Sequence, residues 1–285
     1  MSIGRGNTGP AGLEMSQIGA RQRAAPGRRA RFEQVKALSR ADGGAIPIVV
    51  ATFGLLHGAW HDSSCWEPLT ECLEAIGHRC VAPELPLHDP EAGYEQRARP
   101  MIEALAGVEE EVVVVPHSRG SALGALVAAA RPVAMLVYLC PRMEGVQLPD
   151  DAPARLREGF PYPPVLPDGT SVWDSDTARE VMYARLAPER AQALVQHLRP
   201  MAIPADDYPL DEHPDVPTAL IYAADDELFE PAFERFVARR VLGIDPIEIP
   251  GGHFPMAENP GALAELLDRL VRGNERFARY IDRNI

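Results

Sequence analysis

The chain has 285 residues, of which 46% are hydrophobic and 24% are charged. These proportions are typical of a folded globular protein and exclude the disordered and fibrous classes. No apolar run approaches the roughly 18 residues of a membrane span, and residues 1–40 contain no apolar core of a secretory signal. We therefore expect a cytoplasmic protein that does not bind membranes.

Charge is distributed unevenly along the chain. Residues 1–48 carry eight basic and three acidic side chains, a net charge of +5, and because the whole chain carries −13, the remaining 237 residues carry −18. A body this acidic repels phosphate groups, which argues against a nucleic-acid partner. Residues 1–45 are rich in glycine, arginine and alanine and have no sustained apolar period. We predict a disordered basic arm there, followed by one folded domain over residues 46–285.

From residue 46 onward, short apolar runs alternate with amphipathic segments of helical length. This alternation predicts the α/β class, with a mostly parallel sheet covered by helices. The predicted strands are Ile46–Leu56, Arg79–Ala82, Glu111–Pro116, Val133–Leu139, Thr218–Ala223 and Pro246–Ile249. The predicted helices are Pro68–Ile76, Glu95–Leu105, Arg119–Ala130, Pro231–Arg240 and Gly261–Val271.

The segment over about residues 142–217 interrupts this alternation. It begins with prolines and aromatic residues, and it then carries two short helical patterns at Asp176–Leu186 and Pro188–Leu198. Because it stands between one predicted strand and the next, we interpret it as a cap inserted into the domain.

The third predicted strand leads directly into a candidate nucleophile. Pro116-His117-Ser118-Arg119-Gly120 follows the apolar run, and a helix of small residues comes next. This is the context of a nucleophile elbow, in which a sharp strand-to-helix turn lifts a serine above the sheet. Gly120 relieves the crowding of such a turn, whereas Pro116 stands where the G-x-S-x-G pattern has its first glycine. Ser118 is therefore the candidate nucleophile.

The first strand ends in a second candidate site, His57-Gly58-Ala59-Trp60-His61. A histidine-glycine turn at this place suits a loop that supplies one backbone donor to an oxyanion hole. The N–H groups of Ala59 and Arg119 are then the two expected donors. For the Arg119 side chain we expect pairing with an acidic neighbour, with recognition of a carboxylate on the substrate as the alternative.

The fifth and sixth strands supply an acid and a base. Ala224-Asp225-Asp226-Glu227 follows the fifth strand, and Gly251-Gly252-His253 follows the sixth. The chain order serine, aspartate, histidine, each after a strand, suits a catalytic triad. Successive residues of an extended strand point in opposite directions, so only one of the two aspartates can face His253. Geometry alone does not choose between them.

Residues 50–285 resemble the α/β hydrolases, in particular the small-cap branch of bacterial carboxylesterases, plant methylesterases and hydroxynitrile lyases. The motifs that carry the resemblance are His57-Gly58-Ala59-Trp60-His61 with Trp66, Ser118 in its elbow, Asp226, Gly251-Gly252-His253-Phe254-Pro255-Met256 and His197-Leu198-Arg199-Pro200. The resemblance implies a three-layer α/β-hydrolase fold, with a sheet of about six strands and a small helical cap. It also selects Asp226 as the acid. Pro116 and Ser121 depart from it, since the family commonly has glycine at both places.

These observations predict a serine hydrolase that cleaves a small-molecule carboxylic ester through an acyl-enzyme intermediate, with no cofactor and no metal. The expected catalytic residues are Ser118, Asp226 and His253. The expected substrate-binding residues are Trp60, His61 and Trp66. The cap aromatics Phe160, Tyr162 and Trp173 are further candidates, and core packing is an equal alternative for all of these aromatics. The sequence leaves a homodimer open.

Several alternatives use the same site. Plant hydroxynitrile lyases of this branch also need a lysine on the cap side, and the only lysine of this chain is Lys36. A lactonase, thioesterase or cyclase would use the same serine chemistry, because a triad determines the reaction type better than the substrate. A catalytically inactive binding protein of the same fold is the alternative outside enzymes, and Pro116 is the only residue that hints at it.

Overall fold

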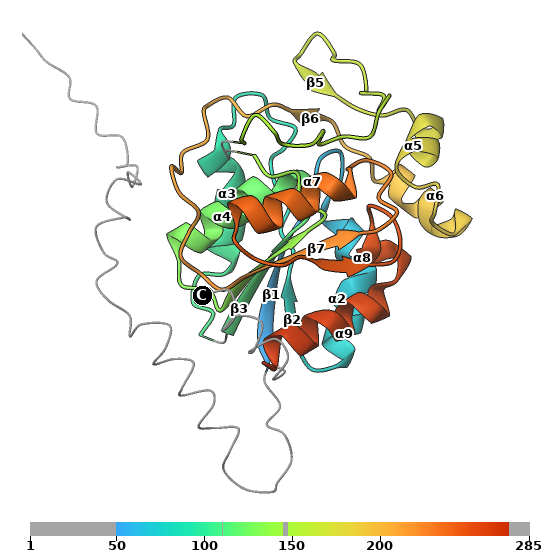
Figure 1. The fold of residues 1–285 in the computed structure, drawn as a ribbon. Coiled ribbons are helices and arrows are strands. Elements are labelled where there is room, and N and C mark those ends of the chain that lie inside the picture. Colours follow the sequence, from blue (N-terminus) through green and yellow to red (C-terminus); the bar gives the residue numbers. More distant parts are fainter. Residues whose placement is uncertain (1–49, 110, 145–147, 274–285) are drawn as a thin grey trace, which may run out of the picture. The chain divides into compact units, whose positions relative to one another are not determined.

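A computed structural model describes residues 50–109, 111–144 and 148–273, so the predicted basic arm lies outside the described residues. The central feature is a six-stranded sheet in the order β2-β1-β3-β4-β7-β8 (Figure 1). All neighbouring pairs in it are parallel. The strands are β1 (Ala51–Leu56), β2 (Arg79–Val81), β3 (Glu111–Pro116), β4 (Met135–Leu139), β7 (Thr218–Ala223) and β8 (Ile247–Ile249). The predicted α/β-hydrolase sheet of about six strands is confirmed.

The central strands are buried on both faces, as their continuous apolar runs predict. Every residue of β1 and β4 is buried, and in β3 only Glu111 is exposed. The strands at the two edges, β2 and β8, have partly exposed residues and no fully buried ones. The hydrophobic core is therefore centred on β1, β3 and β4, and the carboxyl ends of β1 and β3 precede two of the motifs described above.

Helices cover both faces of the sheet (Figure 1). On one side α2 packs against α9, and on the other α3 packs against α4. The helices of the main body are α2 (Glu67–Ala75), α3 (Tyr94–Ala104), α4 (Ser121–Ala130), α7 (Pro231–Phe236), α8 (Pro255–Glu258) and α9 (Pro260–Val271). Helix α4 is the most buried of them, because its alanines and glycine let it lie close to the sheet.

Two helices begin or end differently from the prediction. The predicted helix Arg119–Ala130 is a 3₁₀ turn at Ser118–Gly120 followed by α4, because the elbow turns too sharply for an α-helix to begin at Arg119. The predicted helix Pro231–Arg240 is α-helical only to Phe236 and continues as a π-helical turn over Val237–Val241.

The segment predicted as a cap lies between β4 and β7 in the chain. It contains a small antiparallel pair, β5 (Thr170–Ser171) with β6 (Met201–Ala202), and two helices, α5 (Ser175–Val181) and α6 (Pro188–Gln196). These elements lie beyond the carboxyl ends of the sheet strands (Figure 1). The cap is tied to the loop after β1, since the Arg199 amide donates to the Trp60 carbonyl at 2.9 Å and Trp60 Nε1 donates to Ser171 Oγ at 3.2 Å.

None of the helices in the described ranges is both long and apolar enough to cross a membrane.

The proline that ends β3 fits because helix α4 carries a glycine opposite it. A Cβ atom added to Gly124 would lie 2.4 Å from Cγ and 2.7 Å from Cβ of Pro116. A proline ring cannot move away as the tip of a flexible side chain can. The absence of a side chain at position 124 therefore leaves space for the ring of Pro116, which stands where G-x-S-x-G has its first glycine.

We expect Gly124→Ala to lower the free energy of unfolding by up to about 2 kcal/mol. Overpacking of a tight core costs about 1–3 kcal/mol, and the higher helix propensity of alanine offsets roughly 1 kcal/mol of that. Chemical denaturation of the full chain measures the change. Gly261→Ala is the matched control, because it also lies in a helix and nothing lies within 4 Å of an added Cβ. Equal effects of the two substitutions would contradict the steric explanation, and adding Pro116→Gly to Gly124→Ala should restore stability.

Candidate active site

The candidate site lies where the strand order of the sheet reverses. The chain passes from β1 to β2 at one edge, whereas β3 pairs with the other side of β1 and the later strands continue away from it. The carboxyl ends of β1 and β3 therefore diverge into different crossovers, which leaves a crevice where ligands bind in open α/β sheets. The loop that contains Ala59 follows β1, and Ser118 follows β3.

Ser118 has a strained backbone at this crevice. Its φ angle is +51°, in the left-handed region that L-residues rarely adopt. Two glycines allow the turn: a Cβ on Gly120 would lie 2.8 Å from the His57 carbonyl oxygen, and a Cβ on Gly58 would lie 2.9 Å from Ser118 Cβ. Ser121, at a position where the family commonly has glycine, donates through Oγ to the Ser118 carbonyl at 2.6 Å. Strain of this kind is often concentrated at functional sites.

A continuous chain of hydrogen bonds connects Ser118, His253 and Asp226. The Nε2 atom of His253 lies 3.0 Å from Ser118 Oγ, and its Nδ1 atom lies 2.7 Å from Asp226 Oδ2. The second oxygen, Asp226 Oδ1, accepts from the amides of Leu228 and Phe229, both at 2.8 Å. With Nδ1 protonated and donating to Asp226, Nε2 is free to accept the Ser118 hydroxyl proton. The three predicted residues are thus brought together.

The two neighbouring aspartates have different environments. Asp226 is fully buried, whereas Asp225 is exposed and its Oδ2 pairs with Arg185 Nη2 of the cap at 3.0 Å. Their side chains diverge as expected, but at a turn and not along extended backbone, since Ala224 and Asp225 lie in a turn after β7 and the Asp226 amide donates to the Ala223 carbonyl at 3.3 Å. Asp226 faces His253, and Asp225 faces the cap.

Glu234, on α7, is buried close to this group and was not singled out from the sequence. Neither carboxyl oxygen has a hydrogen-bond partner within the described part of the chain. Burial, together with the negative charge of Asp226, raises its pKa well above the usual value. The neutral form of Glu234 is therefore favoured in this buried setting. A lone glutamate in an amphipathic helix gives no sequence signal of this.

The histidines around the site hold its loops in place. His57 accepts from the Leu85 amide through Nε2 at 3.1 Å and donates through Nδ1 to the Gly58 carbonyl at 3.1 Å. His61 donates through Nδ1 to the Ala59 carbonyl at 2.7 Å and is bonded through Nε2 to the Tyr183 hydroxyl. Burial lowers the pKa of His61 to about 4, so its ring is neutral at neutral pH. His61 therefore fixes the loop around Ala59.

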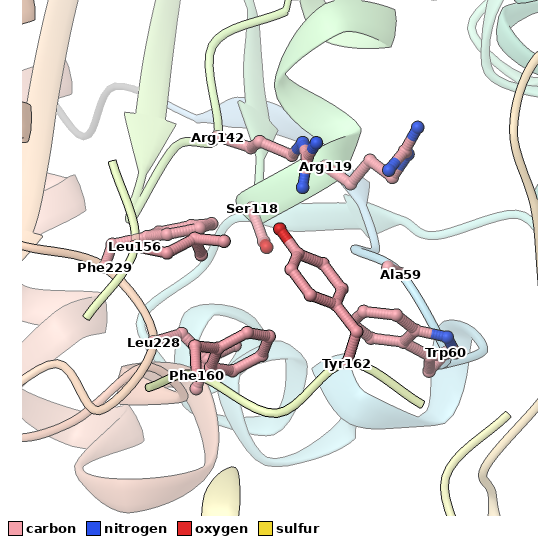
Figure 2. A pocket seen from close by; sticks show the side chains of 10 residues that line it. All are labelled: Ala59, Trp60, Ser118, Arg119, Arg142, Leu156, Phe160, Tyr162, Leu228 and Phe229. Atoms are coloured by element: carbon pink, nitrogen blue, oxygen red, sulfur yellow. The ribbon is translucent and has the colours of Figure 1, made fainter. Parts of the chain in front are cut away.

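A small pocket opens in front of Ser118, with an empty volume of about 310 Å³. Figure 2 shows the side chains around it. Ala59, Trp60 and Arg119, all predicted site residues, line this pocket. Phe160 and Tyr162, two cap aromatics for which the sequence left pocket lining and core packing open, also line it, whereas Trp173 is not among the described lining residues. The lining residues that were not predicted are Arg142, Leu156, Leu228 and Phe229.

Two predicted substrate-binding residues lie elsewhere. His61 and Trp66 are not among the described residues that line the pocket. Both ring nitrogens of His61 are already hydrogen-bonded, to Ala59 and to Tyr183. Trp66 is fully buried in the core, with its ring nearly perpendicular to that of His117 at a centroid distance of 6.2 Å. Of the three, Trp60 alone reaches the pocket, helped by a left-handed backbone with φ of +62°.

One group of side chains in the described residues has metal-ligand geometry. Ligand atoms of Cys140, Asp226 and His253 lie within 4.8 Å of one another. Asp226 and His253 are bonded to each other, however, and burial raises the pKa of the Cys140 thiol well above its usual value. A neutral thiol is a poor metal ligand, because the thiolate is the binding form. The arrangement suits proton transfer from Ser118 better than metal binding.

Comparison with known proteins agrees with this geometry, since residues 55–266 match the alpha/beta hydrolase family. The chain belongs to that family. A pyrethroid hydrolase from Sphingobium wenxiniae is 25% identical to this hydrolase over 240 residues, which cover 75% of this chain and 85% of the relative. Norfluorocurarine synthase 1 from Strychnos is 23% identical over 266 residues, covering 77% and 94% of the two chains.

Solved structures show the same fold. The crystal structure of a pyrethroid hydrolase from Sphingobium faniae matches this hydrolase with a TM-score of 0.68 at 25% identity, over 80% of this chain and 99% of the other. A methylesterase from Arabidopsis matches with a TM-score of 0.60 at 20% identity, over 78% and 99%. The names of the two pyrethroid hydrolases support hydrolase activity for the family member described here.

Proposed function

We propose that this protein is a serine-dependent carboxylic-ester hydrolase that works through an acyl-enzyme intermediate. The observation that carries the proposal is the hydrogen-bond chain from Asp226 through His253 to Ser118, which ends in the pocket. Nucleophile, base and orienting acid are each within hydrogen-bond reach of the next, which is the arrangement that activates a serine hydroxyl.

The reaction follows from this order. His253 Nε2 takes the Ser118 proton as Oγ forms a bond to the ester carbonyl carbon, and Asp226 stabilises the charged imidazolium. The tetrahedral intermediate expels the alcohol, which receives the proton back from His253. Water then attacks the acyl group, giving its proton to His253, and the acid leaves as Ser118 Oγ is protonated again.

The developing oxyanion needs donors close to Ser118. We assign this role to the backbone amides of Ala59 and Arg119, because both residues line the pocket beside the nucleophile. Removing one such donor in another hydrolase costs about 2.7–4 kcal/mol of transition-state stabilisation. The bonds of His57 and His61 to the loop after β1 fix the Ala59 side of this arrangement.

Covalent labelling tests the proposal directly. A fluorophosphonate should add irreversibly to the full-length protein, with the whole mass increase on the peptide that contains Ser118. His253→Ala should slow the labelling strongly, because the hydroxyl then has no base. Labelling that leaves Ser118 unmodified, or no labelling of a folded protein, would refute the assignment.

A further inference from the structure

Two arginines in the pocket share one carboxylate. Arg142 donates through Nε to Glu144 Oε1 at 2.8 Å, and Arg119 Nη2 lies 3.2 Å from the same oxygen. The other oxygen, Glu144 Oε2, accepts from the Tyr94 hydroxyl at 3.1 Å. Both arginines line the pocket beside Ser118. Glu144 is therefore fully engaged, yet it balances only one of the two positive charges.

A third guanidinium lies near this pair. Arg155 precedes the pocket residue Leu156, and its guanidinium carbon lies 5.2 Å from the centre of the Phe233 ring. Its Nε atom is buried with no hydrogen-bond partner in the described ranges. Burial and the charges of Arg142 and Arg119 lower its pKa, whereas the charge of Glu144 raises it. Arginine nevertheless stays protonated in proteins.

The charge balance of this pocket is positive. Two arginines, Arg119 and Arg142, contact the single carboxylate of Glu144, and no residue that lines the pocket in the described part of the chain is acidic. Asp226 is already bonded to His253 and to two backbone amides. In the sequence, Glu144 is followed by Gly-Val-Gln at residues 145–147, none of which is charged. An excess of positive charge thus lies beside the nucleophile, although residues 49–285 carry −18 overall.

The tip of Arg142 faces the pocket. Its Nε atom holds Glu144, and in Figure 2 the guanidinium of Arg142 and the hydroxyl of Tyr162 point toward Ser118, whereas the Arg119 guanidinium points away. A guanidinium presents its donors in a planar fork that matches both oxygens of a carboxylate, and such charge-assisted pairs are stronger than neutral hydrogen bonds. Arg142 is therefore placed to bind an anionic group on a molecule whose ester lies at Ser118.

We propose that the substrate is an ester that also carries a carboxylate, and that Arg142 binds that carboxylate while Ser118 attacks the ester carbonyl. The inference rests on the proposed function and adds the substrate class. Arg119 and Arg155 hold the local potential positive, so the pocket concentrates anions at one place on an otherwise acidic molecule.

Matched substrates that differ only in charge test the proposal. For a carboxylate on the acyl side, the pair is the p-nitrophenyl monoester of adipic acid and its methyl ester. For a carboxylate on the alcohol side, it is 4-acetoxybenzoate and its methyl ester. In at least one pair we expect kcat/KM to be about 10- to 100-fold higher for the anion at low salt. This preference should decrease as salt screens the charges.

Variants connect that preference to Arg142. Arg142→Gln should reduce the ratio of anionic to neutral kcat/KM to near one, and Arg142→Lys should keep part of it because the charge remains. Arg269→Gln, on the exposed face of α9, removes the same charge from the surface and should keep the wild-type ratio. A ratio near one in the wild type for both pairs, or an unchanged ratio in Arg142→Gln, would overturn the proposal.

A binding measurement separates this inference from the proposed function. Calorimetric titration of Ser118→Ala with the two p-nitrophenyl esters and the two acetoxybenzoates reports affinity without turnover. Preferential binding of an anion by Ser118→Ala, together with no hydrolysis of any ester by the wild type, would refute the function and support the anion site. Equal binding and equal turnover within both pairs would refute the anion site and leave the function standing.

Discussion

Ser118→Ala is expected to reduce ester turnover by about 10⁴-fold or more, because the acyl group then has no atom to which it can be transferred. In another serine hydrolase the corresponding loss is about 10⁶ in kcat. The effect should be on kcat, measured with a short p-nitrophenyl ester, while the fold is unchanged, since alanine fills the same space beside Gly58. Circular dichroism and the melting temperature of the variant check the fold.

Ser175→Ala is the control for this substitution. Ser175 begins α5 in the cap and is exposed, so its loss should leave turnover close to that of the wild type. Retention of most of the activity by Ser118→Ala would show that another group carries the reaction, and the hydrogen-bond chain to His253 would then have a purely structural role.

Asp226→Asn is expected to lower kcat by about 10⁴-fold, the loss seen for the equivalent change in a serine protease. The asparagine amide can donate to His253 Nδ1 and so favours the tautomer in which Nε2 carries the proton and cannot accept one from Ser118. The fold should persist, because the amide oxygen can still accept from the Leu228 and Phe229 amides that Asp226 Oδ1 now serves.

Asp225→Asn is the neighbouring control. Its pair with Arg185 is exposed, and exposed ion pairs contribute about 0–1 kcal/mol to stability. We expect kcat within about twofold of the wild type, since such a pair contributes nothing to the proton transfer. If Asp225→Asn were inactive and Asp226→Asn active in the same assay, the acid role would pass to Asp225.

Much of the fold could be predicted because its signals are local. Continuously apolar runs identify buried parallel strands, and the residues that follow them meet at one edge of the sheet for topological reasons. This is why Ser118, Asp226 and His253, far apart in the chain, could be grouped from the sequence alone. The choice of Asp226 over Asp225 needed the family pattern, and the structure shows its physical basis in burial.

The wall of the pocket could not be predicted in the same way. Arg142, Leu156, Phe160 and Tyr162 come from irregular segments after β4, where no periodicity relates a residue to a direction. Phe160 and Tyr162 could be named as candidates because they are cap aromatics, but the sequence could not separate pocket lining from core packing. Glu144 illustrates the problem, since its pairing with Arg119 joins two loops and has no sequence spacing that would identify it. The environment of Trp66 was missed for a related reason: a motif gives a residue's place in the chain, but not the face on which its side chain packs.

The contact between Pro116 and Gly124 changes what the elbow motif means. The usual pattern requires glycine two residues before the nucleophile, which places the limit on side-chain volume at that single position. In this protein position 116 on β3 and position 124 on α4 share the same space, and the glycine is on the helix instead of the strand. The requirement is on the combined volume of the pair, so a search pattern that reads only the strand examines half of the constraint. Relatives with a side chain at position 116 should carry glycine one helical turn into the following helix.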